Sequence, residues 1–151
     1  MVKKTKDLKY YEAVGRRKEA LARVRLYIVG KDNSVSINGM KIKAGEIYVN
    51  KKPISSLFPN PADQNRYQFP LKLTQNENRF AIFIFVKGGG TKGQLDAVAH
   101  GLARAIEKVD RDAYRSIIKN YGLLTRDART RERRKVGTGG KARRKKQSPK
   151  R

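Results

Sequence analysis

The chain of 151 residues contains no cysteine, no tryptophan and a single histidine. Without cysteine it cannot form disulfides, thiolate metal sites or a cysteine nucleophile, and one histidine alone cannot build a His/Cys zinc cluster. Long apolar runs are also missing: the longest is Phe80 to Val86, far below the roughly 20 residues that a membrane-spanning helix needs. The N-terminus has no apolar stretch after its lysines, so we expect neither a secretory signal nor a transit peptide there.

Acidic residues are scarce, since 13 Asp and Glu stand against 37 Lys and Arg, which gives a net charge of +24. Such a charge makes a compact body repel itself and indicates a polyanionic partner, an anionic membrane surface or a disordered chain. Residues 126–151 hold 13 of the basic side chains and only 2 acidic ones, with three apolar residues, whereas 1–125 hold 54 apolar residues. The sequence therefore predicts a globular domain over 1–125 and a basic C-terminal extension over 126–151.

Hydrophobic periodicity predicts the main elements of the body. Strands are expected at 8–14, 20–29 and 79–87, the last one central in its sheet, and helices at 94–109 and from Asp110 to Gly122. In the second strand Ala20, Ala22, Val24, Leu26 and Ile28 should be buried, while Arg23, Arg25 and Tyr27 should form a basic, exposed face. The pattern is typical of an α+β fold, a two-layer sheet with helices on one face.

Several shorter segments carry weaker signals. Residues 30–54 contain an internal echo that predicts two short strands or a hairpin, with turns at Asn38-Gly39 and Asn50-Lys51. A short helix is expected over 53–58 and one more helical turn from Pro61, while Pro70 indicates an edge strand or irregular passage. Thr125 could cap a short helix through Arg134, and we expect about the last 15 residues to be disordered without a partner. The predicted buried stripe of the last long helix consists of Ala113, Tyr114, Ile117, Ile118 and Tyr121.

A glycine motif follows the third main strand. Gly88, Gly90 and Gly93 satisfy G-x-G-x-x-G before a helix, but the second parallel strand and acidic residue of a dinucleotide site do not follow. Gln94 stands where a P-loop would have lysine, so we predict no nucleotide cofactor. The loop could instead hold an RNA phosphate with the help of Lys92, or it is simply a tight turn.

Residues for catalysis are not evident. His100 has no Cys, Ser or Asp partner that the sequence places beside it, and we expect a packed or solvent-edge histidine. Most carboxylates neighbour Lys or Arg, so salt bridges and capping explain them better than acid/base chemistry, and acidic metal-binding clusters are missing. We therefore predict that the chain is not an enzyme and has no cofactor.

The basic segments favour nucleic acid. Gly15-Arg16-Arg17-Lys18 joins two strands and is either a phosphate clamp, in which arginine forks grip two oxygens, or a solvated turn. The extension has the charge for tight, salt-dependent binding by counterion release, and it lacks the apolar face that membrane binding needs. The aromatic residues fit strand and helix cores, so base stacking is not indicated. RNA is mildly preferred over DNA.

Three blocks resemble the universal S-nine family of the small ribosomal subunit, in its bacterial form. They are YEAVGRRKEALARVRL at 11–26, GGGTKGQLDAVAHGLARAI at 88–106 and GLLTRDARTRERRKVGTGGKARRKK at 122–146, with smaller matches at 49–53 and 58–59. Residues 31–44 look like an insertion relative to the family pattern. Ser148-Pro149 replace the usual aromatic-Ser before the terminal Lys150-Arg151.

The resemblance implies a fold like the second domain of ribosomal protein S-five, with a left-handed βαβ crossover. It also implies a structural role in the ribosome of a bacterium or organelle, beside neighbouring proteins of the subunit head, with the extension reaching the peptidyl-site tRNA anticodon stem-loop through Lys150 and Arg151. The residues expected to bind the 3′ major domain of small-subunit rRNA are Arg16, Arg17, Lys18, Lys92, Arg126, Arg129, Arg131, Arg133, Arg134, Lys135, Lys141, Arg143, Arg144, Lys145 and Lys146. The alternatives are the protein subunit of an RNA-processing ribonucleoprotein and an architectural DNA-binding protein.

Overall fold

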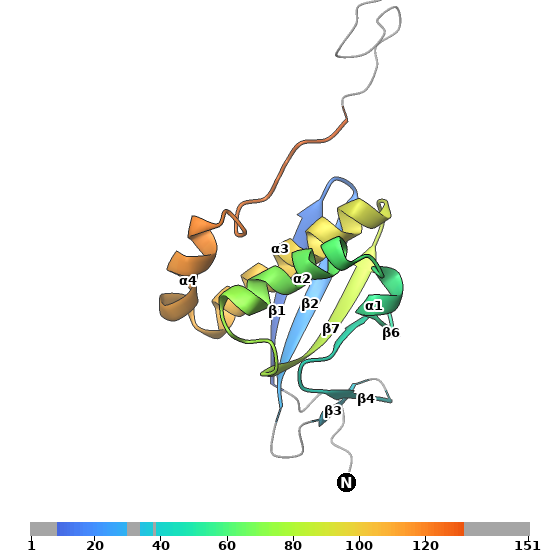
Figure 1. Ribbon diagram of the computed structural model, residues 1–151, viewed down its shortest axis with the longest axis vertical. Coiled ribbons are helices and arrows are strands. Elements are labelled where there is room, and N and C mark those ends of the chain that lie inside the picture. Colours follow the sequence, from blue (N-terminus) through green and yellow to red (C-terminus); the bar gives the residue numbers. More distant parts are fainter. Residues whose placement is uncertain (1–8, 30–33, 38, 132–151) are drawn as a thin grey trace, which may run out of the picture.

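The computed structural model describes residues 9–29, 34–37 and 39–131. Its main sheet has five strands in the order β1-β2-β7-β5-β6, and a two-stranded hairpin, β3–β4, lies beside it (Figure 1). The elements are β1 Tyr10–Arg17, β2 Ala20–Ile28, β3 Ser34–Ile37, β4 Met40–Lys43, β5 Ile47–Val49, β6 Lys52–Pro53, α1 Ile54–Leu57, α2 Pro61–Leu73, β7 Phe80–Lys87, α3 Thr91–Val109 and α4 Arg111–Asn120.

The predicted central strand is confirmed. β7 pairs antiparallel with β2 and parallel with β5, and its residues from Phe80 to Ile84 are all buried. Helices α2 and α3 lie against one face of the sheet (Figure 1), where Val24, Leu26 and Ile82 join the main core. The α+β class is therefore confirmed. Within the described ranges, none of the helices is both long and apolar enough to cross a membrane.

Helix α3 lies unusually close to the edge strand β1, and two glycines make this possible. A Cβ atom built on Gly15 would lie 1.9 Å from the carbonyl oxygen of Ala97 and 2.4 Å from the backbone nitrogen of Gly101. A Cβ on Gly101 would lie 2.7 Å from a methyl group of Val24. Since such distances are far inside van der Waals contact, the glycines set the spacing between the helix and the sheet.

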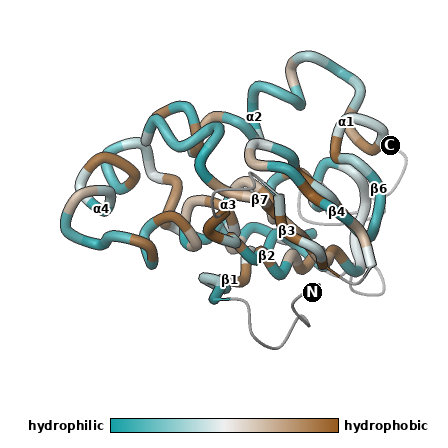
Figure 2. The backbone as a smooth tube through the Cα atoms, turned by 90° about the horizontal axis from the view of Figure 1, so that it is seen from below, coloured by the Kyte–Doolittle hydropathy of each residue, from teal (hydrophilic) through white to brown (hydrophobic). Residues whose placement is uncertain are grey.

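The hairpin β3–β4 covers one end of the opposite sheet face. Its residues Val35, Ile37 and Ile42 form a second apolar cluster with Tyr27 and Phe83 of the sheet. Figure 2 shows the apolar colouring of the hairpin beside the strands it covers. The predicted exposure at the end of β2 is wrong for this reason: Tyr27 is buried by the hairpin, whereas Ile28 is half exposed.

Both turns expected within 30–54 join strands. Residues 38–39 connect β3 to β4, with Gly39 at φ +81°, although Asn38 lies outside the described residues. Asn50 and Lys51, at φ +47° and +71°, connect β5 to β6. The Asn50 side chain also bonds the backbone N–H and C=O of Val86, at 3.0 and 2.9 Å. The short helix predicted over 53–58 is α1.

Pro61 begins a helix as predicted, but this helix is much longer than one turn, and the expectation for Pro70 is wrong. Both belong to α2, a helix of 13 residues that begins at Pro61 and is capped by Asn60, whose side chain accepts from the Ala62 N–H at 3.1 Å. Pro70 lies in the C-terminal part of the helix, and it is buried together with Leu71 and Tyr67. Packing against the core therefore outweighs the local helix-breaking tendency of proline.

Helix α4 follows its predicted boundaries but not its predicted buried stripe. Asp110 caps it by accepting from the Ala113 N–H at 3.1 Å, and Gly122 follows its end at φ +68°. Only Ile118 is buried in it, while Ile117 and Tyr121 are exposed, because α4 contacts the body mainly through the end of α3 (Figure 1). The helix predicted from Thr125 through Arg134 is not formed over 125–131. The rest of that range and the predicted disorder lie outside the described residues.

Candidate nucleic-acid interface

Three polar side chains of α3 bond the outer backbone edge of β1. The Arg104 guanidinium donates to the Val14 carbonyl at 2.6 Å, and the Lys108 ammonium donates to the Glu12 carbonyl at 2.8 Å. His100 accepts from the Arg16 N–H at 3.4 Å. The three side chains are four residues apart on α3, a rise of about 6 Å, and their partners are two residues apart on β1, a rise of about 6.6 Å. The spacing along the helix therefore matches the spacing along the strand. The edge strand is thereby protected from pairing with another chain.

His100 also fixes the segment that follows α4. Its Nδ1 accepts from Arg16, so the hydrogen is placed on Nε2, which donates to the Leu124 carbonyl at 3.2 Å. Burial lowers the pKa of His100 below its ordinary 6.5; the Leu124 hydrogen bond opposes this shift, and the nearby Arg104 and Arg126 charges add to it. His100 is half-buried, which agrees with the predicted packed or solvent-edge histidine, and it connects β1, α3 and the chain beyond α4.

We expect the fold to lose stability as His100 becomes protonated. Its pKa is lower in the folded than in the unfolded chain, so the unfolded chain binds more protons between the two values. The free energy of unfolding should therefore be greatest above pH 6.5 and fall as the pH drops from there through the folded pKa. Denaturant titrations at pH 7.5, 6.5 and 5.5 measure this, with His100→Gln as the variant that cannot titrate. Equal pH dependence in the two proteins would contradict the role of His100.

Arg17 ties the beginning of the basic extension to the body. Its Nη1 donates to the Arg129 carbonyl at 2.7 Å, and its Nη2 lies 3.0 Å from Asp127. Its Nε lies 3.4 Å from Asp96 of α3. The side chain is only 14% exposed. The Arg17 guanidinium thus binds groups within the chain, whereas the side chains of its neighbours Arg16 and Lys18 are exposed.

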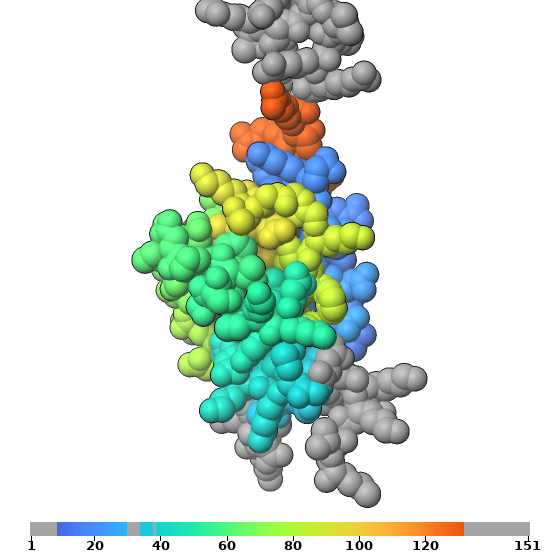
Figure 3. Space-filling model, turned by 90° about the vertical axis from the view of Figure 1, so that its right-hand side faces the viewer, coloured from blue at the N-terminus to red at the C-terminus, as the bar shows by residue number. Residues whose placement is uncertain are grey.

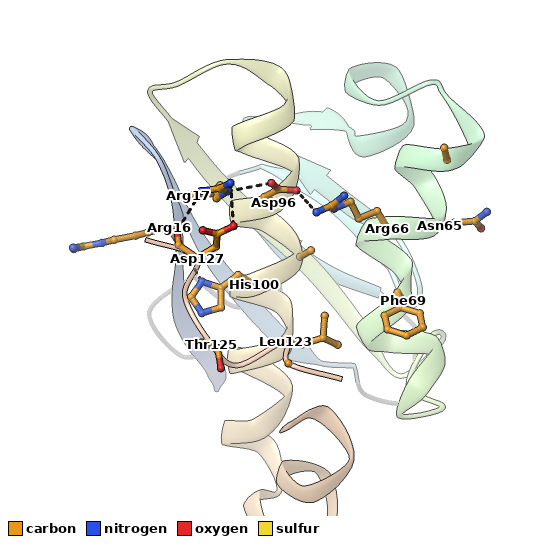
Figure 4. A pocket seen from close by; sticks show the side chains of 13 residues that line it. Arg16, Arg17, Asn65, Arg66, Phe69, Asp96, His100, Leu123, Thr125 and Asp127 are labelled. Carbon is orange, nitrogen blue, oxygen red and sulfur yellow. Dashed lines mark hydrogen bonds and ion pairs between the residues drawn. The ribbon is translucent and has the colours of Figure 1, made fainter. Parts of the chain in front are cut away.

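These groups line a pocket of about 510 Å³ between α2, α3 and the segment after α4 (Figure 4). Arg66 of α2 reaches Asp96 at 2.9 Å and completes a chain of alternating charges, Arg66–Asp96–Arg17–Asp127. Hydrogen bonds from the Arg129 side chain and backbone hold the pKa of Asp127 well below its usual range. The Arg16 side chain points away from this pocket (Figure 4). Arg17 and Arg66 thus use their charge on carboxylates within this pocket, whereas Arg16 faces outward (Figure 4).

The glycine loop lies against the turn between β1 and β2. Gly88 and Gly89 have φ of +75° and +66°, and a Cβ on either would lie within 3 Å of the backbone of Glu19 or Ala20. Gly90 is the N-cap residue of α3 and offers no side-chain hydrogen bond, and Lys92 is exposed in the first turn. The close approach explains two of the glycines structurally, and it places Lys92 beside the basic turn.

Comparison with known proteins identifies the family of this chain. A sequence model of the family described as ribosomal protein S9/S16 matches residues 15–151, from the glycine of the basic turn onward. The chain belongs to the ribosomal protein S9/S16 family. The S-nine resemblance is confirmed, and with it the prediction of a ribosomal protein of the small subunit that is not an enzyme.

Three bacterial relatives of this family, each named small ribosomal subunit protein uS9, cover most of the chain. The one from Maridesulfovibrio salexigens is 46% identical over 90% of this chain and 92% of its own length. The one from Bifidobacterium animalis subsp. lactis is 42% identical over 82% and 67%, and the one from Solidesulfovibrio magneticus is 41% identical over 87% and 89%.

Some of the residues that we predicted to bind rRNA lie together at one end of the body. Figure 3 shows the beginning of the extension directly above the turn between β1 and β2. The exposed predicted residues in this region are Arg16, Lys18, Lys92, Arg126, Arg129 and Arg131. The predicted residues outside the described part of the chain are Arg133, Arg134, Lys135, Lys141, Arg143, Arg144, Lys145, Lys146, Lys150 and Arg151.

Phe85 of β7 is exposed, contrary to the expectation that the aromatic residues lie in strand and helix cores. Phe85 is 48% exposed, although its strand reads as an uninterrupted apolar run. Its position directly opposite the exposed Arg23 explains the exposure, because neighbouring residues on one sheet face share an environment, but this register is not readable from either strand alone.

Proposed function

We propose that the basic end of the body binds rRNA of the small-subunit head, in the 3′ major domain. Support comes from the meeting of three segments distant in sequence: the turn with Arg16 and Lys18, the loop before Lys92, and the beginning of the extension. Two sets of contacts hold these segments together: Gly88 and Gly89 approach the backbone of the turn, and Arg17 donates to the Arg129 carbonyl. Exposed cations at a shared end fit the phosphates of a folded RNA.

The extension, on this proposal, continues from the body to a second ligand. Residues 126–151 carry 13 basic and 2 acidic side chains. Arg17 holds the beginning of this segment against the body through Asp127 and Arg129. The S-nine resemblance supports peptidyl-site tRNA as the target of Lys150 and Arg151, with rRNA and neighbouring head proteins along the way. It also supports a left-handed crossover between β5 and β7, which are parallel neighbours joined through β6, α1 and α2.

The rRNA contact is tested by the salt dependence of binding. We expect the full chain to bind a transcript of the 3′ major domain, with an affinity that falls steeply as salt rises. Lys18→Gln combined with Lys92→Gln should lower the slope by about one for each lost phosphate contact. Lys72→Gln, an exposed lysine near the other end of β7, is the matched control and should leave the slope unchanged.

Crosslinking with sequencing of the bound nucleic acid distinguishes the alternatives. Small-subunit rRNA is the expected partner. Recovery of precursor tRNA would favour an RNA-processing ribonucleoprotein, and recovery of genomic DNA would favour an architectural role; either result would contradict the proposal.

Removal of Ser148 to Arg151 tests the tRNA contact. We expect subunit assembly to remain nearly intact and binding of tRNA to the peptidyl site to weaken, because the last two cations no longer hold its phosphates. Filter binding of tRNA to reconstituted subunits is the measurement. Unchanged tRNA affinity together with unchanged reading-frame fidelity would rule this contact out.

A further inference from the structure

Within the described part of the chain, the sheet face opposite the helices is covered only at the end beneath the hairpin β3–β4. Along β7, the residues that point to this face change from buried to exposed: Ala81 and Phe83 lie under the hairpin β3–β4, while Phe85 and Lys87 are exposed. Phe85 is 48% exposed although it sits in the middle strand of the sheet. A large aromatic side chain at the centre of a sheet face that the described residues leave uncovered is a feature that folding of this chain does not explain.

The uncovered half combines apolar and basic side chains. We call it the open sheet face. It lies on the antiparallel strands β1, β2 and β7, which pair so that Arg23 is opposite Phe85 and Leu21 is opposite Lys87. Its six residues are Val14, Arg16, Leu21, Arg23, Phe85 and Lys87.

Charge on the open sheet face is of one sign. The face contains three cations and no carboxylate. The carboxylate at its border, Glu12, is bonded to Arg25 at 2.7 Å and lies 3.8 Å from Arg23, whose side chain is 51% exposed. Arg23 and Lys87 are both exposed on this face, so each can contact an anion beside Phe85.

The Phe85 ring is held in a defined orientation. It lies edge-to-face with the buried ring of Phe83, with ring centroids 5.5 Å apart and an interplanar angle of 72°. Phe83 is in turn fixed in the cluster beneath the hairpin. An exposed ring that is fixed in this way offers a preformed stacking surface, which lowers the entropy lost on binding.

We propose that the open sheet face binds an unpaired RNA nucleotide whose base stacks on Phe85 and whose flanking phosphates contact Arg23 and Lys87. RNA fits this surface better than a protein does, because the three cations around Phe85 have no carboxylate among them and such a one-sign surface suits the phosphates of a nucleic acid. Aromatic side chains on an exposed sheet commonly stack unpaired bases of RNA. The inference rests on the proposed rRNA-binding function and adds a base contact to it.

Substitution of Phe85 tests the stacking contact. With the full chain and the 3′ major domain transcript, Phe85→Leu should weaken binding about tenfold, because it keeps the apolar volume and removes the ring. Phe85→Tyr should bind within about twofold of the unsubstituted chain. Tyr121→Leu is the control, since Tyr121 is exposed at the end of α4, away from this face. Thermal unfolding of each variant separates binding from folding, and wild-type affinity for a folded Phe85→Leu protein would overturn the proposal.

Photocrosslinking in assembled small subunits identifies what lies on the face. Phe85 is replaced by p-benzoylphenylalanine, and we expect the crosslinked adduct to contain rRNA. An adduct with a ribosomal protein, or no adduct, would overturn the choice of RNA. The salt-slope experiment with Lys18 and Lys92 is independent of this face, so its success alongside either negative result would leave the proposed function standing without the base contact.

Discussion

Replacing Gly15 with alanine is expected to destabilise the fold by about 3 kcal/mol or more, the largest stability effect that we predict for a single residue. The added Cβ would lie 1.9 Å from the Ala97 carbonyl oxygen and 2.4 Å from the Gly101 nitrogen. Both atoms belong to the backbone of α3, so neither can move without displacing the helix. Displacement would also lengthen the bonds from Arg104 and Lys108 to β1.

The measurement is the midpoint of thermal unfolding, which we expect to fall by about 10 °C or more. Two further glycines supply graded controls. Gly101→Ala should have a smaller effect, because its Cβ would lie 2.7 Å from a Val24 methyl group and 3.2 Å from the Gly15 nitrogen, both longer than the 1.9 Å contact at Gly15. Gly90→Ser should change stability by less than about 0.5 kcal/mol, because its Cβ meets nothing within 4 Å and serine is accepted as a helix cap. Equal midpoints for the Gly15 and Gly90 variants would show that α3 does not pack on β1 as closely as described.

The parts of the fold that the sequence predicts correctly are those in which local pattern and tertiary packing agree. Alternation in β2 identifies the buried side of Ala20, Val24 and Leu26, and a continuous apolar run identifies β7 as central. Predictions fail where a distant segment decides burial. Tyr27 is buried only because the hairpin folds over it, and Pro70 remains helical because α2 packs on the core.

For the candidate interface, composition and motifs predict which segments are basic but not which side chains are free. The turn from Gly15 to Lys18 reads as one uniform cluster in the sequence. In the structure Arg16 points outward, whereas Arg17 turns inward to Asp96 and Asp127 (Figure 4). Adjacent strand residues point to opposite sides of a sheet, but the carboxylates that receive Arg17 are about 80 and 110 positions away in the chain, and no local pattern connects them.

Replacing Arg17 with glutamine should therefore lower the stability of the fold and release the extension from the body. We expect any change in RNA binding to follow from these two effects. We expect a loss of about 2 kcal/mol, because Asp96, Asp127 and the Arg129 carbonyl lose a charged hydrogen-bond donor in a mostly buried site. Arg17→Lys should recover little of this, since a single ammonium group cannot reproduce the fork that contacts all three. Thermal unfolding measures the stability term.

The extension itself gives the discriminating readout. Once Arg17 no longer holds Asp127 and Arg129, trypsin should cleave after Arg126 and Arg129 faster than in the unsubstituted chain. Arg16→Gln is the matched control: it removes the same charge one residue away, and we expect unchanged stability and proteolysis but a smaller salt slope for RNA binding. If Arg17→Gln instead leaves unfolding and cleavage unchanged and lowers the salt slope as Arg16→Gln does, then Arg17 is a phosphate ligand like its neighbour. The expected separation of the two variants would mean that the basic turn has two roles, in which Arg16 and Lys18 face RNA while Arg17 sets the direction in which the extension leaves the body.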